Sequence, residues 1–246
     1  METVSFLTTA QIVEVISAFH DALEAHKESI NRLNVYPVPD GDTGTNMFLT
    51  VASVLEEMQP ADPNDLEAVC EAMSHGSLMG ARGNSGVILS QVLRGMSSGF
   101  AKANVIDAQV LASALTEASV AADGAVMKPV EGTILTVVRE VARAARGAAE
   151  TDALVQTIET ALREGEAALE RTPEQLNVLK EAGVVDAGGA GFLLLLHAIL
   201  RVLDGRELPE PENPQGVSVI AADLSREVGV SELRYEVMYL LNAPDE

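Results

Sequence analysis

The sequence contains no tryptophan and only one cysteine, Cys70, so it cannot form an internal disulfide bond. Basic residues are also scarce, because 16 Lys and Arg stand against 37 Asp and Glu and give a net charge of −21. Nucleic acids and anionic lipid headgroups require a positive protein surface. The charge balance therefore excludes both as partners.

Long uninterrupted apolar runs are missing as well. The most apolar stretch, residues 192–203, is broken by His197 and Arg201 and is too short to span a bilayer. The N-terminus has no basic region before an apolar stretch, as a signal peptide would. These features predict a cytoplasmic protein without membrane insertion.

The most informative segment, residues 34–47, reads NVYPVPDGDTGTNM. It places Asp40 and Asp42 on either side of Gly41. Two carboxylates this close repel each other unless a cation lies between them, and oxygen ligands suit Mg²⁺. Gly41 and Gly44 allow a tight turn and a close approach to a ligand. The segment therefore predicts a metal and phosphate site at the start of a helix near Thr45.

Three familiar interpretations of this loop fail. An EF-hand needs an acidic residue where the sequence has Val51. The nucleophile loop of aspartate-dependent phosphatases needs Thr or Val at position 44, which is glycine. A Walker A loop needs a Gly-Lys pair, and the sequence contains none.

Three further glycine-rich segments precede predicted helices, as phosphate-binding helix starts do. They are residues 75–86, 127–133 and 183–191. Asn84 or Ser85 is expected to cap the first of these helices, and Thr133 the second. Gly189 and Gly191 resemble part of a dinucleotide fingerprint, but the third glycine and a βαβ unit are missing, so no Rossmann fold is predicted. A helical fold could bring all four segments to one rim around a nucleotide.

The pattern along most of the chain is helical. Thr8 and Gln11 form a capping box, followed by apolar residues at helical spacing. Further helices are predicted near residues 46–58, 65–75, 84–97, 107–121, 133–148, 152–169 and 190–203. Aromatic residues make up only 3% of the chain, so the core must consist of aliphatic side chains, Met and Ala.

The composition changes after Gly205. We predict a helical domain at residues 1–205, a proline-rich linker at 206–216 and the start of another domain at 217–246. Two short strands are expected in this last part, and the sequence is expected to be truncated within it.

The four quoted segments, in this order, resemble the N-terminal domain of the bacterial fatty acid kinase A subunit. That domain is related to the nucleotide-binding subunit of dihydroxyacetone kinases. The resemblance extends from about residue 5 to about residue 205. It implies an all-α fold, a closed barrel of about eight antiparallel helices with a short β-like tail. It also implies ATP with two Mg²⁺ at one end, and phosphoryl transfer to a fatty acid on a separate carrier protein.

Roles follow from the residues and the resemblance together. Asp40 and Asp42 are expected to bind Mg²⁺, with Asn34 or Asn46 completing the metal shell. Dihydroxyacetone kinases have a third aspartate shortly before this pair, and here the nearest candidates are Asn34 and Val35. The neutral Asn34 fits the fatty acid kinase branch better. The expected nucleotide contacts are Thr43, Gly44, Thr45, Asn46, Asn84, Ser85, Gly86, Met127, Lys128, Thr133, Asp186, Ala187, Gly188 and Gly189.

Two other functions stay open. One is a kinase with a different acceptor, such as a small hydroxyketone. The other is a non-catalytic nucleotide-binding module that regulates a partner. No general base is identified, and an ionised carboxylate acceptor would not require one. The sequence is compatible with a homodimer but does not establish the oligomeric state.

Overall fold

The computed structural model describes residues 5–151 and 153–211. The described residues all belong to one compact unit. The described part contains ten helices: α1 (Thr9–Leu33), α2 (Thr43–Met58), α3 (Leu66–Met79), α4 (Gly83–Ala101), α5 (Ala108–Gly124), α6 (Ile134–Ala148), α7 (Leu154–Glu170), α8 (Thr172–Gln175), α9 (Asn177–Ala182) and α10 (Ala187–Asp204). The predicted strands lie in residues 217–246, outside the described residues.

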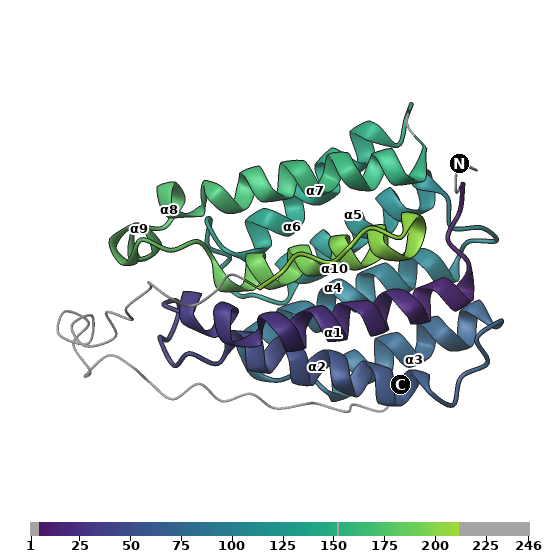
Figure 1. The fold of residues 1–246 in the computed structure, drawn as a ribbon, viewed down its shortest axis with the longest axis horizontal. Helices are drawn as coiled ribbons and strands as arrows, with labels where there is room; N and C mark the ends of the chain where they lie inside the picture. Colours follow the sequence, from purple (N-terminus) through teal and green to yellow (C-terminus); the bar gives the residue numbers. More distant parts are fainter. Residues whose placement is uncertain (1–4, 152, 212–246) are drawn as a thin grey trace. The chain divides into compact units, whose positions relative to one another are not determined.

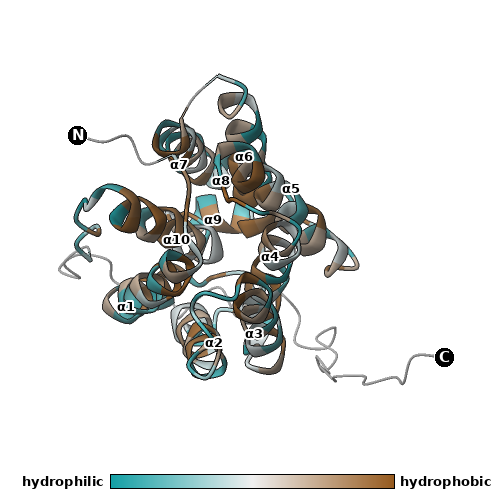
Figure 2. Ribbon diagram, turned by 90° about the vertical axis from the view of Figure 1, so that its right-hand side faces the viewer, coloured by the Kyte–Doolittle hydropathy of each residue, from teal (hydrophilic) through white to brown (hydrophobic). Residues whose placement is uncertain are grey.

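Eight long helices form a closed ring (Figure 2). Each helix from α1 to α7 packs against the next, and α10 lies between α7 and α1. Successive helices run in opposite directions, and α8 and α9 lie at one end (Figure 1). The predicted closed barrel of about eight antiparallel helices is thereby confirmed.

The alternation of directions places the starts of α2, α4, α6 and α10 at one end of the barrel, on the left in Figure 1. These are the four helices that follow the glycine-rich segments. The starts of α1, α3, α5 and α7 lie at the opposite end. Because the long helices alternate in direction around the ring, the four segments that precede them come to a common end.

Local capping explains where several helices begin. The Thr8 side chain accepts from the Gln11 N–H at 3.2 Å, and the Gln11 side chain accepts from the Thr8 N–H, as the capping box predicts. Asp65 and Asp107 cap α3 and α5 in the same local manner. The prediction that Asn84 or Ser85 caps α4 is wrong, because the N-cap is Arg82 and the helix already begins at Gly83. Asn84 and Ser85 therefore lie inside the first turn.

The barrel interior is packed with aliphatic side chains and small residues. At the contact between α4 and α5, a Cβ placed on Gly95 would lie 2.4 Å from the Cα of Ala118. Glycine is therefore required for these two backbones to approach. By length and composition, α10 is the one described helix that could cross a membrane, but 72% of that stretch is buried inside the protein. Its apolar character is explained by its place in the barrel.

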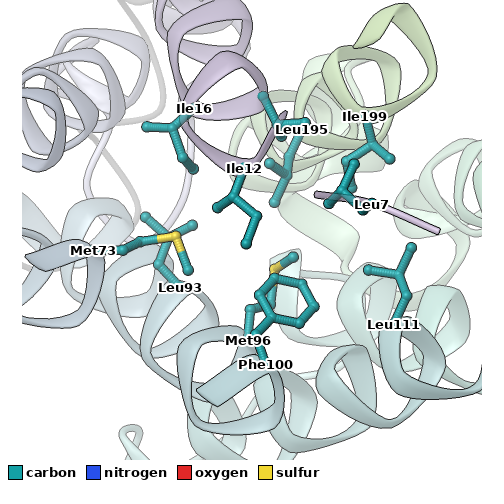
Figure 3. Close-up of a pocket in the computed structure, with 11 residues that line it drawn as sticks. Leu7, Ile12, Ile16, Met73, Leu93, Met96, Phe100, Leu111, Leu195 and Ile199 are labelled. Atoms are coloured by element: carbon teal, nitrogen blue, oxygen red, sulfur yellow. The ribbon is translucent and has the colours of Figure 1, made fainter. Parts of the chain in front are cut away.

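The end of the barrel away from the glycine-rich segments is closed and apolar. The Leu7 N–H donates to the Ile106 carbonyl at 2.8 Å, which links the segments before α1 and α5. A cavity beside them is lined only by apolar side chains, including Met96 and Phe100 (Figure 3). Its volume of about 10 Å³ leaves room for no more than about one water molecule. This cavity therefore offers no ligand site.

Residues 205–211 form a strap that runs back along α10 (Figure 1). Gly205 reverses the chain with a φ of +77°. Arg206 then donates to Glu159 on α7 at 2.7 Å, and the Leu208 side chain packs against the core. His26 Nε2 on α1 lies 2.9 Å from the Pro209 carbonyl oxygen. The first part of the expected linker is thus packed on the barrel, while the predicted division into domains stays a prediction.

Candidate functional site

The two carboxylates of the loop lie together just before α2. Gly41 between them has a φ of +68°, a conformation that favours glycine. The buried Asn34 donates its Nδ2 to Asp40 Oδ1 at 2.6 Å and fixes that side chain. Burial raises the pKa of Asp42, and the neighbouring Asp40 raises it further, while a hydrogen bond from Asn46 opposes the shift. A cation between the carboxylates would relieve their repulsion.

The oxygen ligands of this cluster suit Mg²⁺ but number few. No group of three or more His, Cys, Asp and Glu side chains occurs among residues 5–151 and 153–211. The two carboxylates, with the side-chain oxygen of Asn34 or Asn46, are thus the candidate metal ligands here. Water and ligand phosphate would have to complete its shell.

The first turn of α2 is held against α1. The Asn31 side chain accepts from the Thr45 N–H at 3.1 Å and donates to the Thr45 Oγ1 at 3.0 Å. A Cβ on Gly44 would lie 2.3 Å from the Lys27 carbonyl oxygen. Gly44, predicted as a phosphate contact, is therefore required for close packing of α2 on α1. The Thr45 N–H, predicted to contact phosphate, already donates to Asn31.

The start of α4 lies directly beside the start of α2. Gly83 has a φ of +58°, and a Cβ there would lie 2.2 Å from Asn46 Nδ2. Thr50 on α2 accepts from the Arg82 N–H at 3.2 Å, and a Cβ on Gly86 would lie 2.4 Å from the Thr50 hydroxyl. These close contacts join the carboxylate loop and the Gly80–Gly86 segment into one surface.

No side chain of the N-cap residue covers the first turn of either helix. Both Asp42, before α2, and Arg82, before α4, lack a side-chain cap hydrogen bond. The first N–H groups of a helix have no partner within the helix, and they attract anions. Asn84 and Ser85 are half-buried in the α4 turn and remain accessible to a ligand. Gly86 is buried and its N–H donates to the Arg82 carbonyl at 2.9 Å, so it serves packing against α2 and is a poor phosphate donor.

The starts of α6 and α10 have a different arrangement, because a single buried carboxylate caps both. Asp186 accepts from the Gly189 N–H at 2.7 Å and also from the N–H groups of Gly188 and Ile134. Burial raises the pKa of Asp186 to about 6, and the three hydrogen bonds oppose this shift. The Asp186 N–H donates to the buried Thr172 hydroxyl at 3.1 Å.

The glycines that follow serve packing. A Cβ on Gly188 would lie 3.1 Å from the Ile134 Cβ, and one on Gly189 would lie 2.8 Å from Val137. Asp186, Ala187, Gly188 and Gly189 are all buried, so they offer little surface to a ligand. In the structure this segment holds the starts of α6 and α10 together, a structural role that the sequence analysis did not predict.

The remaining predicted contacts belong to the connection between α5 and α6. Met127 is 98% exposed and Lys128 is also exposed, at the same end of the barrel as the carboxylates. Thr133 is the N-cap of α6, as predicted, but its hydroxyl donates to the Val130 carbonyl at 2.8 Å instead of capping the helix.

Asn31, whose side chain holds Thr45 at the start of α2, is a residue of this site that the sequence analysis did not identify.

Comparison with known proteins identifies the fold. The DAK2 domain family matches residues 37–201, a stretch that contains the carboxylate loop and all four helix starts. The chain belongs to the DAK2 domain family. This family is related to the subunits of dihydroxyacetone kinases. The relationship to the fatty acid kinase A subunit is compatible with these matches but is named in none of them.

The DAK2 domain is similar to Protein YloV of Bacillus subtilis (strain 168), with 48% identity over 198 residues, which are 80% of this chain and 36% of the relative. An uncharacterized protein of Staphylococcus haemolyticus is 48% identical over 187 residues, 76% of this chain and 34% of the relative. An uncharacterized protein of Staphylococcus saprophyticus is 46% identical over 187 residues, which are 76% of this chain and 34% of the relative. The chain spans about a third of the length of the curated relatives it matches.

Proposed function

We propose that this DAK2 domain is a cytoplasmic kinase domain that binds ATP with Mg²⁺ and transfers the γ-phosphoryl group to a fatty acid carboxylate. The observation that supports this most directly is the position of Asp40 and Asp42. They lie at the start of α2, next to the start of α4, and neither helix has a side-chain cap from its N-cap residue. Carboxylates for a cation and N–H groups for an anion thus occur on one surface.

The contrast between the helix starts favours one orientation of the nucleotide. Asp186 already accepts from the Gly188 and Gly189 N–H groups of α10 and the Ile134 N–H of α6, so these three groups are poor phosphate donors. The phosphates are better accommodated at α2 and α4. The exposed Met127 and Lys128, on the α6 side of the same end, then suit the nucleoside.

The chemistry of the site is positioning and charge neutralisation. Bound Mg²⁺ supplies electrostatic stabilisation of the charge on the transferring phosphoryl group. Asp40 and Asp42 would hold the cation, and Asn34 keeps Asp40 in place. Asn84 and Ser85 would orient the phosphates from α4. An ionised carboxylate acceptor needs no proton removed, so a general base is not required.

The acceptor of the phosphoryl group and the protein that carries it form the second part of the proposal. We favour a fatty acid presented by a separate fatty-acid-binding protein, which would form an acyl phosphate. The resemblance of the four segments supports this, as does Asn34 in place of a third carboxylate. Since the matched stretch covers only 36% of the Bacillus relative, we expect acceptor transfer to require the additional parts of such proteins. A small hydroxyketone acceptor and a regulatory role without transfer are the alternatives.

Calorimetry of ATP binding, with and without Mg²⁺, tests the metal assignment. Asp42→Asn should weaken Mg·ATP binding by on the order of 10–100-fold or more, since loss of even outer-shell groups has effects of that size. Glu14→Gln is the matched control. It also removes one exposed carboxylate, but near the start of α1, at the end of the barrel away from Asp42. Equal affinity of wild type and Asp42→Asn would contradict the assignment.

The acceptor is tested separately with a protein that includes the additional parts of the relatives. Acyl phosphate formed from fatty acid on its carrier can be trapped as a hydroxamate with hydroxylamine. Phosphorylation of dihydroxyacetone in place of fatty acid would establish the first alternative. Nucleotide binding without transfer to either acceptor would establish the second.

A further inference from the structure

The side chain of Asn31 makes two hydrogen bonds to one residue on another helix. From α1, it accepts from the Thr45 N–H at 3.1 Å and donates to the Thr45 Oγ1 at 3.0 Å. Thr45 lies in the first turn of α2, three residues after Asp42. Both side chains are half-buried, at the margin of the candidate site.

These two bonds make the Thr45 hydroxyl an acceptor from Asn31 and turn its hydrogen away from that side chain. A backbone N–H can only donate, so the atom of Asn31 that faces it must be the carbonyl oxygen. The amide nitrogen then faces Thr45 Oγ1, and since an amide NH₂ can only donate, Oγ1 must accept. The hydroxyl hydrogen is left for a different partner. Within the described residues, the Thr45 hydroxyl donates to no group.

The packing of α1 on α2 holds this arrangement in place. A Cβ on Gly44 would lie 2.3 Å from the Lys27 carbonyl oxygen and 3.1 Å from Asn31 Oδ1. The absence of a side chain at Gly44 therefore lets the α2 start come within hydrogen-bond distance of Asn31. The Thr45 hydroxyl thus accepts from Asn31, with its hydrogen free for another partner, before any ligand binds.

We propose that Asn31 is a positioning residue that makes the Thr45 hydroxyl a hydrogen-bond donor to a phosphate group of the nucleotide. This inference rests on the proposed function. A hydroxyl that accepts from an amide is polarised and has its proton directed elsewhere, and an anionic oxygen is the strongest acceptor that it can meet. Asn31 lies before residues 37–201, which the family comparison matches, so the contact is not part of that match.

A pair of substitutions at Thr45 tests the hydroxyl itself. Thr45→Val keeps the shape and the N–H but removes the hydroxyl, and should weaken Mg·ATP binding by roughly tenfold or more, the size of a hydrogen bond to a charged group. Thr45→Ser restores the hydroxyl and should recover most of the affinity. Wild-type affinity in Thr45→Val would overturn the inference.

Asn31→Asp tests the positioning role. The introduced carboxylate can still accept from the Thr45 N–H, but it also accepts from the hydroxyl and turns its hydrogen away from the ligand. The substitution adds charge as well, so it is measured in both the wild-type and the Thr45→Val backgrounds. Positioning through the hydroxyl predicts a clearly smaller loss of affinity in the Thr45→Val background. An equal loss in both backgrounds would show a charge effect alone and overturn the inference.

Calorimetry of the 246-residue chain separates this result from the proposed function. Wild-type protein that does not bind Mg·ATP would contradict both, whereas binding with equal losses in the two backgrounds would contradict only the role of Asn31. Thermal unfolding establishes that each variant is folded. If Asn31→Asp does not fold, Asn31→Ala takes its place in the cycle, because it frees the hydroxyl to rotate. The loss of Mg·ATP affinity caused by Asn31→Ala should then also be smaller in the Thr45→Val background.

Discussion

Asp186 is predicted to be the most important single cap in the barrel. Its carboxylate accepts from backbone N–H groups at the start of two helices, Ile134 of α6 and both Gly188 and Gly189 of α10. Asp186→Ala would remove all three acceptors at once. Because the site is buried, water cannot easily replace them.

The magnitude follows from two opposing effects. Each buried N–H left without a partner costs about 1–3 kcal/mol, so three of them cost roughly 6 kcal/mol in the free energy of unfolding. The substitution also removes a buried charge whose pKa is raised to about 6. That shift of about two units corresponds to roughly 3 kcal/mol recovered at neutral pH. The expected net loss is therefore about 3 kcal/mol.

Chemical denaturation at pH 7 measures this loss against two matched controls. Asp65 and Asp107 each cap one helix through a single N–H at a surface site. Asp65→Ala and Asp107→Ala should each lower the free energy of unfolding by about 1 kcal/mol. If Asp186→Ala is no more destabilising than these controls, the two-helix cap is not a major source of stability and the reasoning fails.

Two further predictions concern the same end of the barrel. The pKa of Asp186 is raised in the folded protein. Wild type should therefore lose on the order of 3 kcal/mol of stability relative to Asp186→Asn as the pH rises from about 4 to about 6. If the denaturation midpoints of the two proteins change equally with pH, this prediction is contradicted. Gly44→Ala should destabilise by about 1–3 kcal/mol, because its Cβ would meet the Lys27 carbonyl oxygen at 2.3 Å. In contrast, Gly147→Ala, in open space on α6, should stabilise by about 0.5–1 kcal/mol. Equal shifts in Tm for the two glycine variants would refute the packing argument.

The features that sequence reasoning predicted are those that depend on nearby residues. The capping box of Thr8 and Gln11 spans three positions, and the helix periodicity spans a few turns, so both are visible without the fold. The short helices α8 and α9 were not predicted, because four to six residues contain too few turns to show a periodic pattern. The N-cap of α4 was misplaced, since Arg82 offers no side-chain cap that a sequence could reveal.

The parts of the candidate site that were missed depend on contacts between helices. Asn31 and Thr45 are 14 positions apart, and Asp186 reaches Ile134 across more than fifty. Nothing local distinguishes a glycine that contacts phosphate from one that allows helices to approach, so Gly44 and Gly188 could be assigned only from the fold. The loop of Asp40 and Asp42 was found because its own spacing implies repulsion and hence a cation.

The strap has a consequence for whatever polypeptide follows it. A chain that continued straight from α10 would leave the barrel about 27 Å from the start of that helix, given its 18 residues. The strap instead brings Pro209 back to His26, five residues before Asn31 on α1. A segment attached at residue 211 therefore begins in the half of the barrel that contains the carboxylates. A short flexible tether at this point would keep such a segment at a local concentration in the millimolar range near the proposed nucleotide site.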